Sequence, residues 1–256
     1  MKLFPQAIGT LCLILGLIAN TKSANSTQKE TKTIDRKAVE SIIREYILNN
    51  PSIVEQALEN LSKQKEQAKR LLERRALKEN IKELFHDSLD PIGGNASGDI
   101  TVVSFFDYNC GYCKITTPVL NSLIARDKKV RVVFKEFPIL GPDSVTAAKA
   151  ALAARKHVNY LDFHNALMKS RRVKPRSVIK IANKLGINGK KLEQEMQNPA
   201  LNQIIKRNYI LAQRLGINGT PAFVVGEKLI RGAVDLEHLV MVIEEQRKII
   251  KNRKQK

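Results

Sequence analysis

Cysteine is scarce in this chain, and its scarcity limits the chemistry that these side chains can perform. Only three cysteines occur among 256 residues, at Cys12, Cys110 and Cys113. A structural zinc site needs about four ligands, and the four histidines of the chain show no ligand spacing. Covalent haem attachment requires a histidine directly after the second cysteine of the pair, where this chain has Lys114. We therefore expect neither a metal nor a cofactor.

Aromatic residues are also sparse, since tryptophan is absent and aromatics make up 5% of the chain. The chain is nevertheless strongly basic, with 44 Lys and Arg against 25 Asp and Glu and a formal net charge of +19. A nucleic-acid-binding protein concentrates its basic residues on one face beside stacking aromatics, whereas lysines occur here in every segment. We expect no nucleic-acid partner, while attraction to anionic membrane surfaces or acidic clients stays open.

Residues 1–24 have the features of a secretory signal peptide. Lys2 provides the positive start, an apolar stretch runs from Leu11 to Ile18, and small residues follow. The stretch is shorter than the roughly 20 residues of a membrane-spanning helix, and an uncleaved anchor is the alternative to export. We predict export to the periplasm. Cleavage would remove Cys12 and the charges of Lys2 and Lys22, which lowers the formal charge from +19 to +17.

The segment that follows predicts a tether and then a helical arm. Residues 25–33 are polar, and apolar residues then recur at helical spacing over residues 34–89. Asn50 interrupts this pattern, and Pro51 suits the first position of a second helix, where its missing N–H is not needed. A helical arm has no second layer of its own, so its apolar stripe must pack on the main domain or on copies of itself. Both alternatives stay open.

A βαβ unit is predicted next. The Gly-rich segment 90–99 predicts a hinge, with the domain boundary near residue 98. Continuous apolar runs at 100–106 and 130–137 predict strands that are buried on both faces. Between them the chain predicts a helix from the cysteine pair to about Arg126. The cysteines therefore lie at the start of a helix that connects two strands.

The remainder of the chain predicts a helical block and a closing ββα segment. Apolar periodicity is helical over about residues 143–216. Residues 218–232 then predict a hairpin that turns at Gly226, and a last helix runs from Leu236 to about residue 250. We expect an α/β domain over residues 98–252 with a helical insertion, preceded by the α-helical N-terminal arm.

Redox exchange is the chemistry that the spacing of Cys110 and Cys113 fits. Residues three apart lie on one face of a helix, so the two sulfurs can reach each other. At the helix N-terminus, unpaired N–H groups and the positive dipole end would favour the attacking thiolate of Cys110. Cys113, one turn further, would be buried and would resolve the mixed disulfide. A purely structural disulfide is disfavoured because closing so short a loop stabilises little.

The segments FFDYNCGYC, KEFPILGPDS, INGTPAFVVG and LIRGAVD, in this order, resemble the DsbA-like branch of the thioredoxin superfamily. This resemblance covers about residues 98–250. It implies a thioredoxin fold, cysteine-containing exported clients, a membrane thiol-redox partner, and a cis Thr220–Pro221 peptide that faces the cysteine pair. The inner dipeptide, Gly111-Tyr112, differs from the Pro-His of strong oxidases. Together with Thr220 it resembles the DsbC type of exported disulfide isomerase.

The resemblance also bears on assembly and on the direction of electron flow. Isomerases of exported proteins are generally oligomeric, and the arm at 34–89 resembles the N-terminal stalks of the trimeric isomerases of the ScsC kind. We therefore expect a homo-oligomer, with a trimer as the expected form, that reduces or isomerises disulfides in secreted proteins. The alternatives are a DsbA-type oxidase, or a non-enzymatic chaperone or surface binding protein whose cysteines are incidental.

Other residues near the motif have two interpretations each. Many relatives carry an acid six positions before the first cysteine, where this chain has Ser104. Asp107 and Glu136 are candidates for proton handling instead, against a surface Asp and a packed Glu at a strand end. Tyr108 and Phe223 either line a client groove or belong to the core.

Overall fold

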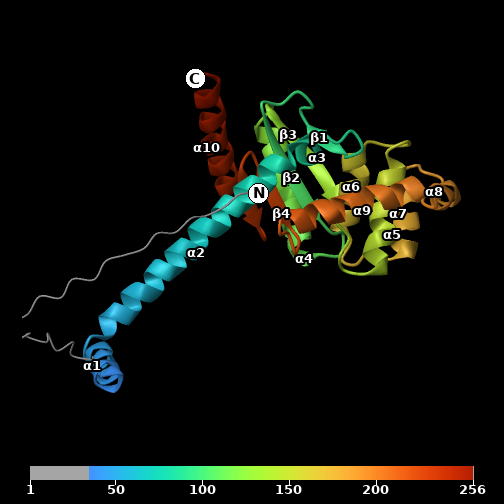
Figure 1. The fold of residues 1–256 in the computed structure, drawn as a ribbon. Helices are drawn as coiled ribbons and strands as arrows, with labels where there is room; N and C mark the ends of the chain where they lie inside the picture. Colours follow the sequence, from blue (N-terminus) through green and yellow to red (C-terminus); the bar gives the residue numbers. More distant parts are fainter. Residues whose placement is uncertain (1–34, 256) are drawn as a thin grey trace, which may run out of the picture. The chain divides into compact units, whose positions relative to one another are not determined.

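A five-stranded mixed sheet forms the centre of the thioredoxin-like part of the chain (Figure 1). The computed structural model describes residues 35–255, so the predicted signal peptide and tether lie outside the described residues. The strands are β1 (Ile92–Gly94), β2 (Ile100–Phe106), β3 (Val130–Glu136), β4 (Ala222–Val225) and β5 (Lys228–Arg231), in the order β1-β3-β2-β4-β5. β2 and β3 are parallel, whereas the other neighbours are antiparallel. The predicted βαβ unit and its two buried strands are confirmed.

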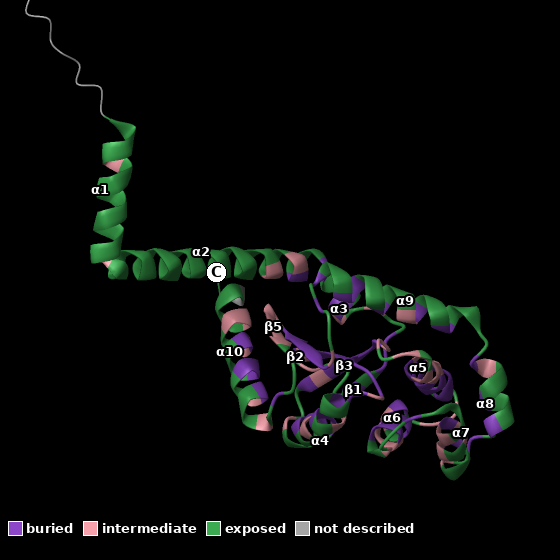
Figure 2. Ribbon diagram, turned by 90° about the horizontal axis from the view of Figure 1, so that it is seen from below, coloured by how far each residue is buried: buried purple, intermediate pink, exposed green. Residues whose placement is uncertain are grey.

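Helices cover both faces of this sheet because side chains alternate across each strand. α4 (Gly111–Arg126) and α10 (Leu236–Lys254) lie on one side, and α3 (Ile81–Phe85) and α9 (Pro199–Arg214) lie on the other (Figure 2). Along β2, Val102 and Phe106 belong to the core cluster under α4 and α10. Val103 and Phe105 belong to the second cluster, with side chains of α9 and of the segment before β1.

The predicted helical block contains four more helices beside the sheet (Figure 2). They are α5 (Pro142–Ala154), α6 (Tyr160–Lys169), α7 (Pro175–Lys184) and α8 (Gly189–Glu195). Proline begins α5, α7 and α9, where its fixed φ suits the first helical turn. The block is helical as predicted, and α9 returns the chain to the sheet. α10 extends about one turn beyond the predicted end.

The predicted hinge at 90–99 holds a strand instead. Residues 92–94 form β1, which pairs antiparallel with β3 at the edge of the sheet. Gly94 has a φ of 70°, and a Cβ there would lie 2.6 Å from the carbonyl oxygen of Val130. The glycine that suggested flexibility therefore permits a close approach of two strands. The chain divides into two compact units between Leu58 and Glu59, and the domain boundary near residue 98 stays a prediction.

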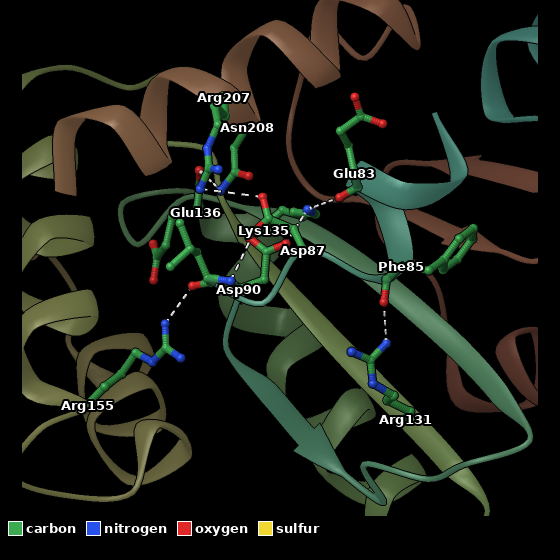
Figure 3. Close-up of polar contacts among 11 residues, drawn as sticks. Glu83, Phe85, Asp87, Asp90, Arg131, Lys135, Glu136, Arg155, Arg207 and Asn208 are labelled. Atoms are coloured by element: carbon green, nitrogen blue, oxygen red, sulfur yellow. Dashed lines mark hydrogen bonds and ion pairs between the residues drawn. The ribbon is translucent and has the colours of Figure 1, made fainter. Parts of the chain in front are cut away.

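Residues 77–90 belong to the second unit because they contribute to its core and to its buried polar contacts. Leu77 and Leu84 are buried in the cluster under α9. The ammonium group of Lys135 is buried with the carboxylate of Asp90 and the backbone carbonyl of Glu83 (Figure 3). Burial raises the pKa of Asp90 to about 6, and the charge of Lys135 opposes that shift. Arginines also donate to backbone carbonyls of this segment, Arg131 to Phe85 and Arg155 to Leu89, each at 2.6 Å.

The first unit is helical in its described part. It contains α1 (Arg36–Asn49) and the first residues of α2 (Pro51–Glu79), whose start at Pro51 is as predicted. α1 has no buried residue, and its apolar side chains are exposed, with Ile42 at 66% and Tyr46 at 58%. Within residues 35–255, no helix combines the length and apolar character that crossing a bilayer requires.

Candidate active site

The two cysteines lie at the junction of β2 and α4. Cys110 is the N-cap of α4, with φ −77° and ψ 119°, and its Sγ accepts a hydrogen bond from the N–H of Cys113 at 3.4 Å. An N-cap side chain occupies the position toward which the unpaired N–H groups of a helix point. Gly111 is the first helical residue, and Tyr112 beside it has 65% of its surface exposed. Cys110 therefore lies at the start of the helix, where the sequence predicted it, and its role as the attacking sulfur stays a prediction.

Cys113 lies one turn into α4 and is buried, with 1% of its surface exposed. Burial raises the pKa of its thiol far above the ordinary value, because a thiolate there would lose its hydration. A hydrogen bond from the backbone of Asp107 opposes this shift. Both cysteines are free in this structure. The two thiols thus differ in environment, although only three positions separate them.

The loop before β4 completes the surroundings of Cys110. The peptide bond between Thr220 and Pro221 is cis, as the resemblance implied. The thiol of Cys110 donates to the carbonyl oxygen of Thr220 at 3.2 Å. β4 pairs antiparallel with β2. The loop before β4 and residues 107–110 after β2, here called the cysteine loop, therefore lie at the same end of these two strands. The structure thereby brings together residues 110 positions apart.

Asp107 is buried, so the interpretation of this residue as a surface acid is wrong. Its carboxylate accepts from the N–H of Asn109 at 2.7 Å, the hydroxyl of Ser144 at 2.7 Å and the N–H of Leu140 at 2.9 Å. Only 1% of the residue is exposed. These bonds fasten the cysteine loop to the segment between β3 and α5.

Two residues that sequence reasoning missed flank the cysteine pair and hold the loop between α6 and α7. The side-chain amide of Asn109 accepts from the N–H of Val173 at 2.8 Å and donates to its carbonyl at 3.1 Å. The ammonium of Lys114 donates to the carbonyls of Ser170 and Arg171 at 2.6 and 2.7 Å. Their only sequence signal is adjacency to the cysteines, because their partners in this loop lie at least 56 positions away.

Glu136 ends β3 in a fully buried polar cluster, as the packed interpretation predicted. The hydroxyls of Tyr108 and Tyr160 donate to its Oε1 at 2.9 and 2.8 Å. Burial raises the pKa of Glu136 to about 8, and these two hydrogen bonds oppose the shift. The Tyr108 hydroxyl also lies 3.1 Å from Nδ1 of His164, whose pKa burial lowers to about 3. Tyr108, which is 1% exposed, is therefore a core residue and does not line a groove.

The other residues singled out near the motif belong to the core. Phe223 is fully buried in β4, and Ser104 is buried in β2. A part in proton handling for Asp107 or Glu136 stays a prediction.

Two families match this chain. Residues 101–244 match the DSBA-like thioredoxin domain, and residues 35–68 match the copper resistance protein ScsC N-terminal domain. The chain is 42% identical to a thioredoxin-like oxidoreductase from Silicibacter pomeroyi DSS-3, covering 65% of this chain and 97% of that one, with a TM-score of 0.64. It is 29% identical to Proteus mirabilis ScsC in a transitional conformation, covering 83% and 96%, with a TM-score of 0.61.

Curated relatives are longer proteins. The Na(+)/H(+) antiporter NhaA of Herminiimonas arsenicoxydans is 26% identical over 163 residues, which cover 62% of this chain and 26% of the antiporter. The chain thus spans about a quarter of the length of the curated relatives that it matches. The family match covers more than half of the chain and agrees with the sheet order and the cysteine site described above. The chain belongs to the DSBA-like thioredoxin family.

Proposed function

We propose that this protein exchanges disulfides in exported proteins, with Cys110 as the attacking thiolate and Cys113 as the resolving thiol. The observation that carries this proposal is the placement of Cys110. Its sulfur caps a helix, accepts from the N–H of Cys113, and lies 3.2 Å from the carbonyl of Thr220 beside the cis-proline Pro221. Gly111 and Tyr112 complete the site between the two cysteines.

The exchange proceeds in two steps. The Cys110 thiolate attacks one sulfur of a client disulfide, forms a mixed disulfide and releases the other client sulfur as a thiolate. A client thiolate can then attack the mixed disulfide and rearrange the client without net electron transfer. Alternatively, Cys113 loses its proton and attacks the Cys110 sulfur, which releases the reduced client and leaves a Cys110–Cys113 disulfide. A membrane thiol-redox partner would reduce that disulfide again.

Burial of Cys113 favours isomerisation of the client over its net reduction. Because burial raises the pKa of this thiol, its thiolate forms rarely at neutral pH and resolution is slow. The mixed disulfide then lasts long enough for a client thiol to attack it. The dipeptide Gly111-Tyr112 agrees, since it places no cation beside the Cys110 sulfur.

The discriminating assay uses ribonuclease. We expect the reduced protein to restore activity to scrambled, fully oxidised ribonuclease in a redox buffer, and the oxidised protein, with its Cys110–Cys113 disulfide, to oxidise reduced ribonuclease more slowly. Rapid oxidation without recovery of the scrambled form would show a DsbA-type oxidase instead. A Cys110→Ser variant that keeps full biological function would show that the cysteines are incidental, as in a chaperone.

We also propose that the arm assembles the protein into a homo-oligomer, with a trimer as the expected form. The apolar side chains of α1 are exposed, and residues 35–68 match the ScsC N-terminal domain. Light scattering on the full mature chain should give several subunits, and Ile43→Lys with Ile47→Lys should give fewer. Glu45→Lys is the matched control. A monomer in the unmodified protein would reject the proposal.

Export is the remaining part of the proposal. If residues 1–24 are a signal peptide, protein isolated from the periplasm should lack them. Mass spectrometry of the intact chain measures this directly, and a full-length mass from a membrane fraction would indicate an anchor.

A further inference from the structure

The loop between α6 and α7 carries an unusual concentration of positive charge. Residues 169–176, here called the basic loop, read KSRRVKPR, with five basic residues and no acid. The side chains of all five are exposed: Lys169, Arg171, Arg172, Lys174 and Arg176. In the part of the chain that the structure describes, none of the five joins an ion pair. We propose that the basic loop binds acidic segments of client proteins beside their reactive cysteine.

The basic loop is held directly against the redox motif. Asn109, which precedes Cys110, makes two hydrogen bonds to the backbone of Val173. Lys114, which follows Cys113, donates to the backbone of the same loop. The backbone of the loop is therefore attached to residues on both sides of the cysteine pair.

A cavity of about 440 Å³ lies between the basic loop and the start of α5. Its lining includes Asn109, Leu140, Asp143, Arg171 and Arg172. Two arginines and one aspartate line the cavity, so its lining carries an excess of positive charge. The arginines present forked donors, which suit the carboxylates of Asp and Glu.

The position of the cavity indicates a protein client rather than a free anion. Asn109 joins the cavity to the cysteine loop, and exposed apolar side chains flank the site, with Tyr112 65% and Leu140 53% exposed. A peptide whose cysteine reaches Cys110 would place its neighbouring residues over these surfaces. Acidic neighbours would meet the arginines, whereas Lys or Arg at the same positions would be repelled.

The test measures exchange with peptide disulfides that differ only in charge. Symmetric disulfides are made from one-cysteine peptides in which Glu, Gln or Lys flanks the cysteine. The reduced protein attacks the peptide disulfide and releases one peptide thiol, and Cys113 then releases the second while the Cys110–Cys113 disulfide forms. Each turnover oxidises the protein by two electrons and yields two peptide thiols. Quenched samples are quantified by alkylation and mass spectrometry.

We expect the Glu peptide to react faster than the Lys peptide, on the order of tenfold at low salt, because complementary charge raises the encounter rate. High salt should reduce the ratio. Arg171→Ala with Arg172→Ala should bring the ratio toward one, and Arg171→Glu with Arg172→Glu should invert it. Lys180→Ala with Lys184→Ala removes the same charge from α7, where both side chains are exposed, and should keep the ratio of the unmodified protein.

The outcomes separate this inference from the proposed function on which it rests. If the arginine variants keep the ratio of the unmodified protein, or the control variant changes it equally, the basic loop is not the recognition surface. If the unmodified protein fails to exchange even the Gln peptide, the proposed redox function fails, and this inference fails with it. Inversion by the glutamate variant cannot arise from partial unfolding, because unfolding would slow all three peptides.

Discussion

Glu136 makes the stability of this protein depend on pH in a direction that its surroundings determine. Its carboxyl is fully buried, and burial raises its pKa from 4.5 to about 8. Between these values the folded protein holds a proton that the unfolded chain has released. Raising the pH therefore favours the unfolded chain, and the free energy of unfolding falls as the pH rises through this range.

Two other groups with displaced pKa values also make the stability depend on pH, and they limit the pH range in which Glu136 determines the slope. Burial lowers the pKa of His164 from 6.5 to about 3, so this residue increases stability as the pH rises up to about 6.5. Asp90, with a pKa raised from 3.8 to about 6, acts in the opposite direction below pH 6. Among the groups of residues 35–255 whose pKa the fold displaces, Glu136 alone titrates between pH 6.5 and 8. One pKa unit corresponds to about 1.36 kcal/mol, so the free energy of unfolding should fall by about 2 kcal/mol across this window.

The assay is urea unfolding followed by circular dichroism at pH 6.5, 7.25 and 8, with the cysteines kept reduced. Glu136→Gln removes the titrating group, so the variant should show no such fall. Oε2 of Glu136 has no hydrogen-bond partner among the described residues. The side-chain amide nitrogen of the introduced glutamine would take its place without an acceptor, which lowers the stability of the variant. The pH slopes of the two proteins are therefore compared, and not their absolute stabilities. Glu244→Gln, at an exposed position of α10, is the control and should keep the slope of the unmodified protein. Equal slopes in the unmodified protein and in Glu136→Gln would refute the reasoning.

Three further outcomes are expected. Cys113→Ser should accumulate mixed disulfides between Cys110 and clients, visible as reductant-sensitive bands on gels, and the absence of such bands would contradict its resolving role. Asp90→Ala leaves the buried ammonium of Lys135 unpaired and should destabilise the fold by about 3–5 kcal/mol in urea unfolding. A loss below about 1 kcal/mol would show that the pair is not buried in solution. Tyr112→His introduces a cationic side chain beside the helix N-terminus and should raise the reduction potential by about 30 mV for each 1.4 kcal/mol of stabilisation of the reduced form. An unchanged potential in glutathione buffers would remove the electrostatic argument about the inner dipeptide.

The central strands could be predicted because their signal is local. β2 and β3 are each seven residues long and apolar for most of their length, and both lie where the sequence predicted strands. Pro51 likewise begins α2 as predicted, since proline at the first helical position is a short-range preference. Each of these features depends on neighbouring residues only.

Features that depend on distant residues were not predictable in the same way. β1 has three residues and exists because it pairs with β3, so its glycines indicated a hinge when taken alone. Asp107 follows a buried strand and suggested a surface acid, yet two of its hydrogen-bond donors, Leu140 and Ser144, lie 33 and 37 positions away. The cysteine motif shows in the sequence because its spacing is local, whereas the groups that orient it come from elsewhere in the chain.

The helical block is part of the redox site rather than a separate module. Asn109 and Lys114 bond the loop between α6 and α7, and Asp107 bonds Ser144 in α5. A movement of the block away from the cysteine loop would leave these groups without partners, and each buried group costs about 1–3 kcal/mol when unpaired. The block and the cysteine loop therefore move together. It follows that a client meets the charges of the basic loop at a position determined by the fold, and these charges select clients before the exchange begins.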